Sequence, residues 1–360
     1  MEQGSNTSIL ETVGLDLGDK YSRFCVLDDR GDAREEGRLK STPDGMRHHF
    51  DDCKSQRVVI ETGTHSPWVD ELLSSLGHQV IVANARKVRL ISENERKTDR
   101  RDAELLARLG RVDPRLLHPI QHRSSKTRTD LETIRARATL VATRTKLINH
   151  VRGAAKSAGC RLVGCSTKSF HKQAPERLTE ELKPILGPLV ETIEHLTMKI
   201  STYEREIEAL CERVYPETQL LRQVKGVGPI SALCFVLTLE DPGRFKSSRH
   251  VGPYLGLVPG KDQSGHSDPE LHITKAGDPM LRTLMVQCAH YIMGPFGEDC
   301  DLRDCGMRIA SNGGKNAKKR ALVAVARKLA VLLHSLWRSA EVYDTKRNSR
   351  PIDTPPLLTR

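Results

Sequence analysis

Two aspartates lie three residues apart in the segment RKTDRRDAEL (residues 96–105), among arginine and lysine side chains. Residues at this spacing share one helix face, so the carboxylates of Asp99 and Asp102 could converge on a metal ion. The alternative is structural, with Asp99 as the N-cap of a helix over residues 102–109 and both charges near the positive end of its dipole. Acidic residues elsewhere in the chain must decide between the two.

Two further acids stand at the ends of predicted strands. Asp16 ends an apolar run in VGLDLGDKYS, and Glu61 ends another in VVIETGTHSPW; both are followed by small residues. A carboxylate at a buried strand end is costly unless it is paired or bound to a cation. Four carboxylates could hold two divalent ions about 3.5–4 Å apart, the arrangement that clamps the attacking and leaving oxygens in phosphoryl transfer. Oxygen ligands favour Mg²⁺, with Mn²⁺ as the alternative, over zinc.

Alternating strand and helix patterns supply the elements that would position these acids. Short apolar runs predict strands at residues 12–17, 23–27, 58–61 and 79–83. Helical periodicity predicts helices at residues 43–53, 67–76, 85–92 and 102–109. The first two strands and residues 33–40 read as an antiparallel meander, and the later strands as parallel βα units. We therefore expect an α/β domain with a mixed sheet over residues 11–118.

The middle of the chain is basic and helical. Residues 119–170 carry eleven Lys or Arg against two acids, and residues 189–214 follow a heptad pattern with Ile or Val at a and Leu or Tyr at d. β-branched residues at a with Leu at d favour a parallel two-stranded coiled coil, which predicts a homo-oligomer. Packing of the same seam within one chain is the alternative. We expect residues 119–216 to form this helical connector.

The C-terminal part is predicted to be a second, mainly α-helical domain over residues 217–340. LLRQVKGVGPISALCFVL (residues 220–237) reads as helix, glycine turn and helix, a helix-hairpin-helix pattern whose backbone N–H groups can approach a phosphate. A plain tight turn is the alternative. A Gly- and Pro-containing loop follows at residues 252–269, and we expect residues 341–360 to form a disordered tail.

Net charge is +11, and the excess lies after residue 118: residues 1–118 sum to −2. Residues 315–328 hold six basic residues and no acid. Such one-sign stretches indicate a polyanionic partner, and we favour nucleic acid over a solvated helix face. The nine cysteines lack any CxxC pair, and no apolar run is long enough to span a bilayer, so we expect no zinc ribbon, no membrane partner and a cytoplasmic protein.

The order GLDLG, VVIETGTHSPW and KTDRRDAELLARL resembles the N-terminal domain of the DEDD transposases of the insertion-sequence 110 family, which is similar to RuvC and ribonuclease H folds. Residues 224–282 resemble the second, transposase domain of that family. The resemblance covers most of the chain and implies a prokaryotic enzyme that acts at the nucleoid. GLDLG also occurs in actin-like kinases, but no second phosphate loop or adenosine loop follows it.

The resemblance implies roles for individual residues. Asp16, Glu61, Asp99 and Asp102 match the four acidic positions, and Ser264 in PGKDQSGH matches the family's nucleophilic serine, with Ser267 a weaker candidate. The family departs from this chain beside that serine, where His266 follows Gly265. We expect nucleic-acid contacts at basic and glycine positions of the second domain, namely Lys225, Gly226, Gly228, Lys275, Arg282, Lys318, Lys319 and Arg320.

The resemblance also implies partners: donor and target DNA, a guide or bridge RNA, and further copies of the chain, since Ser264 and the acids could come from different protomers. The function expected is therefore Mg²⁺-dependent DNA cleavage and rejoining with a serine nucleophile. Two alternatives stay open. One is a RuvC-like, metal-dependent, structure-specific nuclease in which water attacks, and the other is an inactive nucleic-acid-binding protein on the same fold.

Overall fold

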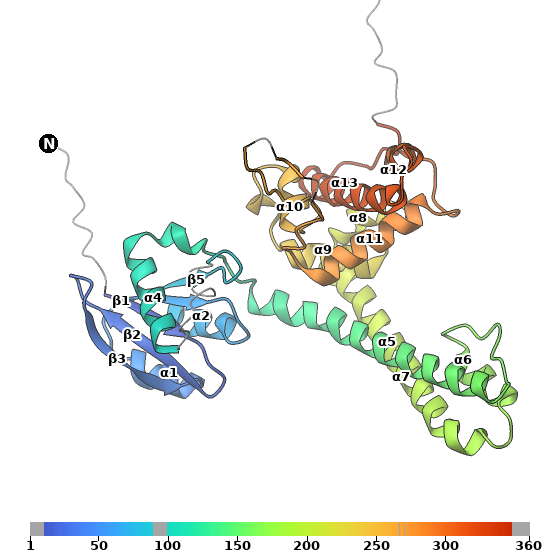
Figure 1. The fold of residues 1–360 in the computed structure, drawn as a ribbon, viewed down its shortest axis with the longest axis horizontal. Coiled ribbons are helices and arrows are strands. Elements are labelled where there is room, and N and C mark those ends of the chain that lie inside the picture. The colour runs from blue at the N-terminus through green and yellow to red at the C-terminus, as the bar shows by residue number, and fades with distance from the viewer. Residues whose placement is uncertain (1–10, 89–98, 266, 270, 348–360) are drawn as a thin grey trace, which may run out of the picture. The chain divides into compact units, whose positions relative to one another are not determined.

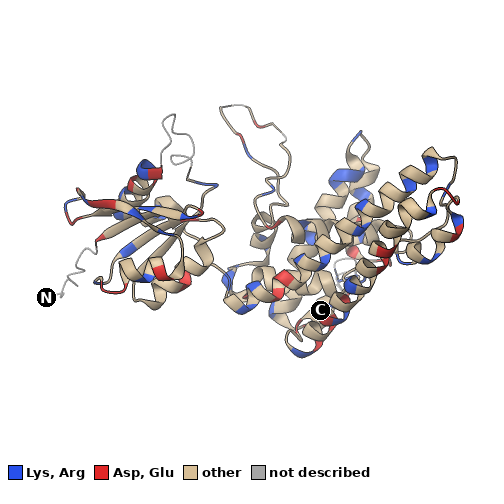
Figure 2. Ribbon diagram, turned by 90° about the horizontal axis from the view of Figure 1, so that it is seen from below, with Lys and Arg blue, Asp and Glu red and all other residues tan. Residues whose placement is uncertain are grey.

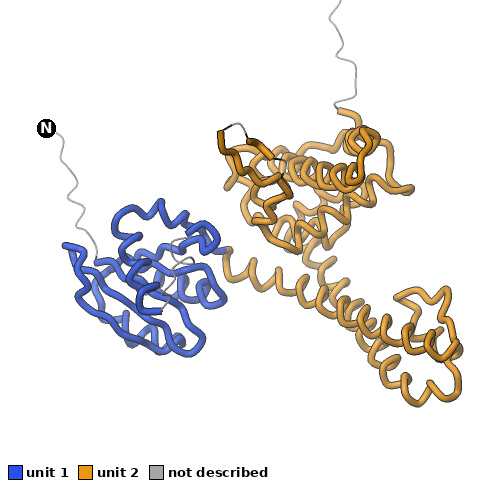
Figure 3. The backbone as a smooth tube through the Cα atoms, viewed as in Figure 1, with its two compact units in different colours: residues 1–122 blue, residues 123–360 orange. Residues whose placement is uncertain are grey.

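The computed structural model describes residues 11–88, 99–265, 267–269 and 271–347. The chain divides into two compact units, residues 1–122 and residues 123–360 (Figure 3). The first unit contains the four acids, and the second contains the connector and the serine loop together.

The first unit is built on a five-stranded mixed sheet of order β3-β2-β1-β4-β5. An antiparallel meander is formed by β1, β2 and β3, whereas β1, β4 and β5 run parallel. The bounds of the strands are β1 Thr12–Asp16, β2 Tyr21–Leu27, β3 Ala33–Lys40, β4 Arg57–Glu61 and β5 Gln79–Ala83. The predicted mixed sheet is confirmed, with boundaries within two residues of those expected.

Helices cover both faces of this sheet (Figure 1). On one face α1 (Pro43–Phe50) and α2 (Ser66–Ser75) bury side chains against Val13, Leu15 and Ile60. On the other face α4 (Asp99–Val112) packs against β1, β2 and β4, and the short η1 (Pro114–Leu117) follows it. Strands buried on both faces explain why β1 and β4 read as continuous apolar runs. Of the helix predicted at residues 85–92, residues 85–87 form a turn, Val88 belongs to no helix, and residues 89–92 lie outside the described residues.

The second unit begins with two long antiparallel helices, α5 (Ser125–Ser157) and α7 (Lys183–Arg213), joined through the short α6 (Phe170–Gln173) and η2 (Pro175–Arg177). Arg137 pairs with Glu204 across the two helices at 2.5 Å, and Arg144 donates to Thr197 at 3.3 Å. From the first pair to the second, the position moves seven residues forward along α5 and seven residues back along α7. The two helices thus have a regular antiparallel register.

The heptad seam packs within the chain rather than only at its surface. Its a positions Ile193, Ile200 and Ile207 are at most 3% exposed, and Ile193 and Ile207 pack into the cores that α7 shares with α5. The fourth a position, Val214, is 42% exposed, and the d positions stay half-buried. The packing within one chain that the sequence left open is therefore what buries the three isoleucines at a, because α5 carries a matching apolar stripe.

Helix α9 is the centre of the C-terminal core, since every residue from Ser231 to Leu239 is buried. Around it pack helices whose apolar faces join one cluster with α9 (Figure 1). The remaining elements of this unit are α8 Thr218–Arg222, α9 Pro229–Leu239, η3 Pro242–Arg244, η4 Ser248–His250, α10 Val251–Tyr254, α11 Pro279–Met293, α12 Asp301–Ser311 and α13 Ala317–Ser339. The expected α-helical C-terminal part is confirmed.

The start of the expected tail is held on this core. The backbone N–H of Tyr343 donates to Gln223 Oε1 at 2.8 Å, and the N–H of Asp301 donates to the carbonyl of Thr345 at 2.9 Å. Residues 341–347 therefore differ from the prediction of a disordered tail, because their backbone groups find partners on the core. Residues 348–360 lie outside the described residues. Within the described residues, no helix has both the length and the apolar character that crossing a bilayer requires.

Candidate active site

The two strand-end acids lie side by side at one edge of the sheet. Strands β1 and β4 are parallel neighbours, with Leu15 opposite Ile60, so Asp16 and Glu61 follow at the next step of the same register. Alternate residues of a strand share a face. Asp16 therefore shares a face with Gly14, and Glu61 shares one with Val59. Gly14 and Val59 both contact α4, Gly14 at Ala103 and Val59 at Gly110.

Two glycines bring α4 against this face of the sheet. A Cβ atom on Gly14 would lie 1.9 Å from the carbonyl oxygen of Ala103, and one on Gly110 would lie 2.3 Å from Val59 Cγ2. Gly14 thus meets the first half of α4, and Gly110 meets Thr12 and Val59 further down the sheet. Helix α4 consequently runs antiparallel to β1, and its N-terminal turn lies at the edge where Asp16 and Glu61 end their strands.

The acids of the N-terminal turn differ in burial. Asp102 is only 4% exposed, next to the Ala103 that packs on Gly14, whereas Asp99 is exposed. Arg100, between them, pairs with Glu36 of β3 at 2.5 Å. Helix α4 begins at Asp99 itself, earlier than residue 102 as predicted from the sequence. Of the two, Asp102 is the carboxylate directed into the fold.

All four carboxylates thus come from elements that meet at one edge and on one face of the sheet. Their donor atoms, oxygens alone, are those that Mg²⁺ or Mn²⁺ prefers. Within the described residues, however, no three His, Cys, Asp or Glu side chains are close enough together to hold a metal ion. The four predicted ligands therefore come from elements that meet at one edge of the sheet, but the described side chains do not form a coordination shell.

Ser264 lies at the tip of a hairpin-like loop between α10 and α11. The stem is formed by a bridge between Pro259 and Ile273, with the N–H of Gly260 donating to the carbonyl of His272 at 2.9 Å. At the tip Ser264 and Ser267 exchange backbone hydrogen bonds of 3.2 and 2.9 Å. Both serines are exposed, and Ser264 Oγ has no hydrogen bond to any described residue. The loop thus presents the Ser264 hydroxyl to solvent, while His266 lies outside the described residues.

The predicted helix-hairpin-helix segment has the expected elements. Helix α8 leads through Gly226, which has φ +95°, to α9, whose N-cap is Gly228. Gly226 packs on the ring of Tyr291, where a Cβ would come within 2.8 Å, whereas Gly228 faces open space. Lys225 pairs with Glu298 at 3.5 Å, so part of its charge is already balanced.

The other predicted phosphate contacts divide between a structural position and a basic surface. Arg282 donates through Nη1 to the carbonyls of Leu255 and Gly277, both at 3.1 Å, and so fixes the base of the serine loop to α11. Lys275 lies on the returning strand of that loop with φ +53°. The remaining three are exposed in the first turn of α13, and these are Lys318, Lys319 and Arg320.

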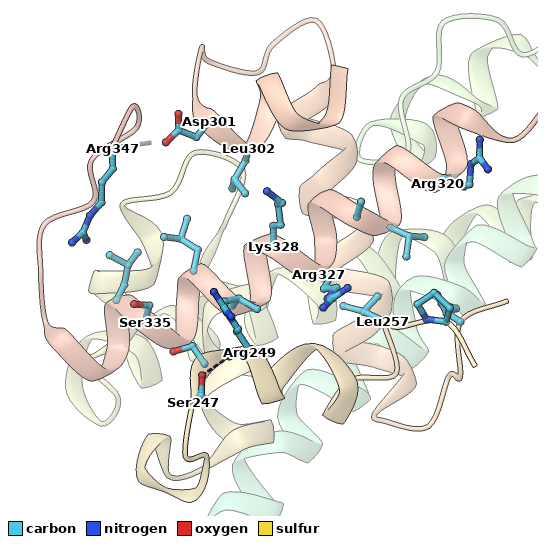
Figure 4. Close-up of a pocket in the computed structure, with 18 of the residues that line it drawn as sticks. Ser247, Arg249, Leu257, Asp301, Leu302, Arg320, Arg327, Lys328, Ser335 and Arg347 are labelled. Atoms are coloured by element: carbon cyan, nitrogen blue, oxygen red, sulfur yellow. Dashed lines mark hydrogen bonds between the residues drawn. The ribbon is translucent and has the colours of Figure 1, made fainter. Parts of the chain in front are cut away.

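A groove of about 1760 Å³ runs along α13 in the second unit, and sequence reasoning missed it as a site (Figure 4). Its walls come from segments far apart in the chain: residues 246–249, the stem of the serine loop, α13 and residues 342–347. The signal that could have found it is the repeat of basic residues along α13, at 319–320 and again at 327–328, two turns later.

Comparisons with known proteins agree with this architecture. Residues 13–158 match the DEDD family of IS110 described as "Transposase", and residues 218–298 match the family described as "Transposase IS116/IS110/IS902 family". The chain is 28% identical over 344 residues to the transposase for insertion sequence element IS1111A of Coxiella burnetii, covering 93% of this chain and 91% of that protein.

Two further relatives extend the comparison. One is the putative transposase y4pF/y4sB of Sinorhizobium fredii, 30% identical over 309 residues, with 83% of this chain and 77% of that protein covered. The other is a probable family 20 transposase of Pseudomonas aeruginosa, 26% identical over 302 residues, with 82% and 87% covered. Both halves of the chain match, and the similarity extends over most of its length, so the protein belongs to the IS110 family of transposases, enzymes that act on DNA.

Proposed function

We propose that this transposase cuts and rejoins DNA by transesterification at Ser264, with Asp16, Glu61, Asp99 and Asp102 as the ligands of Mg²⁺. The observation that carries the proposal is the common edge of the four acids, reached by two parallel strands and the N-terminal turn of α4. An N-cap role for Asp99 does not account for Asp16 and Glu61. Strand-end carboxylates on one face are what a phosphoryl-transfer site of this kind requires.

In the proposed reaction Ser264 Oγ forms a bond to phosphorus, and the bond from phosphorus to one sugar oxygen breaks. The hydroxyl proton leaves to solvent, and the departing sugar oxygen takes up a proton, so the number of phosphate ester bonds is conserved. The serine ester keeps the energy needed to rejoin strands without a nucleotide cofactor. The Ser264 hydroxyl is exposed and has no hydrogen bond to a described residue, which suits this role. When bound, Mg²⁺ would stabilise negative charge on the phosphate oxygens.

The chain's own residues have separate tasks in this scheme. Asp102, buried beside the contact of Ala103 with Gly14, holds its carboxylate in a fixed position, and Asp16 and Glu61 are fixed by the sheet. Arg100 pairs with Glu36 of β3 at 2.5 Å, so part of the charge of this cation is balanced by a residue outside the four acids.

The decisive experiment traps the covalent intermediate. The full-length protein is incubated with Mg²⁺ and a nicked duplex that carries the DNA junction of its own element, and a protein–DNA adduct is sought on a denaturing gel. We expect an adduct with the intact chain and none with Ser264→Ala, with Ser267→Ala as the matched control that retains it. Cleavage that survives Ser264→Ala would instead support a nuclease in which water attacks. DNA binding with no cleavage under Mg²⁺ or Mn²⁺ would support the binding protein.

Asp16→Asn and Asp102→Asn test the acids, because an amide keeps the size of the side chain and removes its charge. We expect both variants to lose adduct formation while they retain DNA binding. Asp99→Asn separates the two roles of the exposed aspartate: loss of the adduct with unchanged thermal stability assigns Asp99 to the ion, and loss of stability alone assigns it to the helix end.

We propose in addition that a guide RNA and a second copy of the chain take part. The support for RNA is the charge of α5, which carries eight Lys or Arg against two acids; Lys126, Lys146 and Lys156 are exposed (Figure 2). The support for self-association is the d stripe of α7, whose four residues remain half-buried: Leu189, Leu196, Tyr203 and Leu210. Sequencing of RNA that copurifies with the protein tests the first. Sedimentation of the chain with Leu196→Glu against the intact chain tests the second, and an unchanged oligomer would contradict it.

A further inference from the structure

The groove along α13 is strongly and unequally charged. Nine of its lining residues are Lys or Arg, and two are Asp. Three of the basic residues, Arg249 of η4 and Arg327 and Lys328 of α13, form no ion pair with any described residue. All three line the pocket in Figure 4. Positive charge without an ion-pair partner among the described residues attracts a phosphate backbone to the groove, because binding releases the counterions of the nucleic acid.

The apolar part of the groove argues against recognition by base stacking. Its floor is aliphatic, with Val323, Val331 and Leu332 of α13 among the lining residues. Two of its lining residues carry an aromatic ring, His272 and Tyr343, against nine Lys or Arg. Single strands are commonly held by bases stacked on several aromatic rings, whereas this surface offers mainly phosphate contacts. The chemistry suits a duplex held by its backbone.

The groove is also continuous with the serine loop. Pro259 and Ile273, which form the bridge at the stem of that loop, line the groove, and so does Lys275. Five residues separate Pro259 from Ser264, which is about 17 Å of extended chain at about 3.3 Å per residue. At about 3.4 Å per base step this reach is about five base pairs. A duplex in the groove would thus lie within a few base pairs of the Ser264 hydroxyl.

We propose that the α13 groove binds duplex DNA by its phosphate backbone, within about five base pairs of the phosphate that Ser264 attacks. This inference rests on the proposed serine chemistry for the position of the DNA, but binding in the groove does not require that chemistry. Arg249, Arg327 and Lys328 contact the phosphates, and the stem of the serine loop forms the wall nearest the reacting end.

The test measures DNA affinity against salt with the full-length protein in the Ser264→Ala background, so that no cleavage occurs. The groove variant carries Arg249→Gln, Arg327→Gln and Lys328→Gln. The control carries Arg47→Gln, Lys54→Gln and Lys199→Gln, three exposed cations outside the groove. Thermal midpoints of both variants are compared with that of the parent. If the midpoint of the groove variant falls, the three single variants Arg249→Gln, Arg327→Gln and Lys328→Gln replace it, each with an expected loss of about 0.9 in slope.

The probe is a fluorescent duplex with the sequence of the element's end. Each lost phosphate contact lowers the slope of log K against log salt by about 0.9. We expect the groove variant to lose about 2.7 in slope and about tenfold or more in affinity at low salt, and the control to match the parent. Equal slopes for the groove variant and the control would overturn the proposal. A loss confined to single-stranded DNA or RNA would overturn it too, because the duplex is the stated ligand.

Footprinting tests the position. In the parent background, the groove variant should lose protection within about five base pairs of the cleaved phosphate and keep it elsewhere. Protection lost at a distant site would show that the groove is not next to the serine. Failure of the serine mechanism alone would leave the salt slopes unaffected, so the two proposals fail separately.

Discussion

Gly14→Ala should disable the active site through one methyl group. The added Cβ would lie 1.9 Å from the carbonyl oxygen of Ala103 and 2.5 Å from the backbone N of Ala107, both in the backbone of α4. Ordinary contacts of this kind are longer than about 3.4 Å, so α4 must retreat by roughly 1–1.5 Å. Overpacking of this kind costs about 1–3 kcal/mol. A displacement of about 1 Å at a catalytic site can cost about 100-fold in rate.

The matched control is Gly63→Ala, two residues beyond Glu61, where a Cβ would meet no atom within 4 Å. Urea unfolding gives the stability of each variant, and the rate of adduct formation on the nicked junction gives its activity. We expect Gly14→Ala to lose about 1–3 kcal/mol and about 100-fold in rate, and Gly63→Ala to resemble the parent. An active Gly14→Ala with parental stability would show that the contact between β1 and α4 does not position Asp99 and Asp102.

Three further predictions concern the second unit. His334 is fully buried, with Nδ1 2.9 Å from Ser248 Oγ and Nε2 3.0 Å from the carbonyl of Pro242, and burial lowers its pKa. The neutral ring is favoured in the folded state, so its contribution to stability is full above about pH 6.5 and falls as the pH drops below that value. In His334→Gln, the free energy of unfolding measured in urea should therefore change less between pH 7 and pH 5 than in the parent. Arg144 is 7% exposed, its buried Nε lacks a hydrogen-bond partner among the described residues, and burial lowers its pKa. Arg144→Met should therefore leave the free energy of unfolding unchanged or raise it. A loss above about 2 kcal/mol would contradict this. Gly226→Ala should cost about 1–3 kcal/mol in thermal or urea unfolding, because the residue has φ +95° and its Cβ would meet Tyr291, whereas Gly228→Ala should be nearly neutral.

Much of the first unit could be predicted because its strands are short and apolar. The runs ending at Asp16 and Glu61 have the composition of buried parallel strands, and their small-residue ends mark where the chain turns. The helix predicted at residues 102–109 is present within α4, which extends from Asp99 to Val112. The sequence could not indicate that Asp102 is buried and Asp99 exposed, because this depends on how closely Gly14 lets α4 approach the sheet.

The second unit was harder to predict because its surfaces combine distant segments. The heptad pattern of α7 predicted a seam, but periodicity does not distinguish a second copy from α5 of the same chain. The groove needs residues 246–249, the stem of the serine loop, α13 and residues 342–347 together. No local pattern predicts that residues 341–347 return to the core, because their partners are distant in the sequence: the side-chain amide of Gln223, the backbone N–H of Asp301, and the carboxylates of Asp299 and Asp304, which pair with Lys346.

The regular register of α5 and α7 has a consequence for how such proteins can change over evolution. Two turns of helix take about 7.2 residues, so adding seven residues to each helix keeps the same faces in contact and lengthens the pair by about 10.5 Å. The cores at the two ends of the pair, one around Ile207 and one around Ile193, would keep their own contacts. Relatives could therefore differ in the reach of this arm by whole heptads, whereas changes of one or two residues in a single helix would bring polar side chains into the seam.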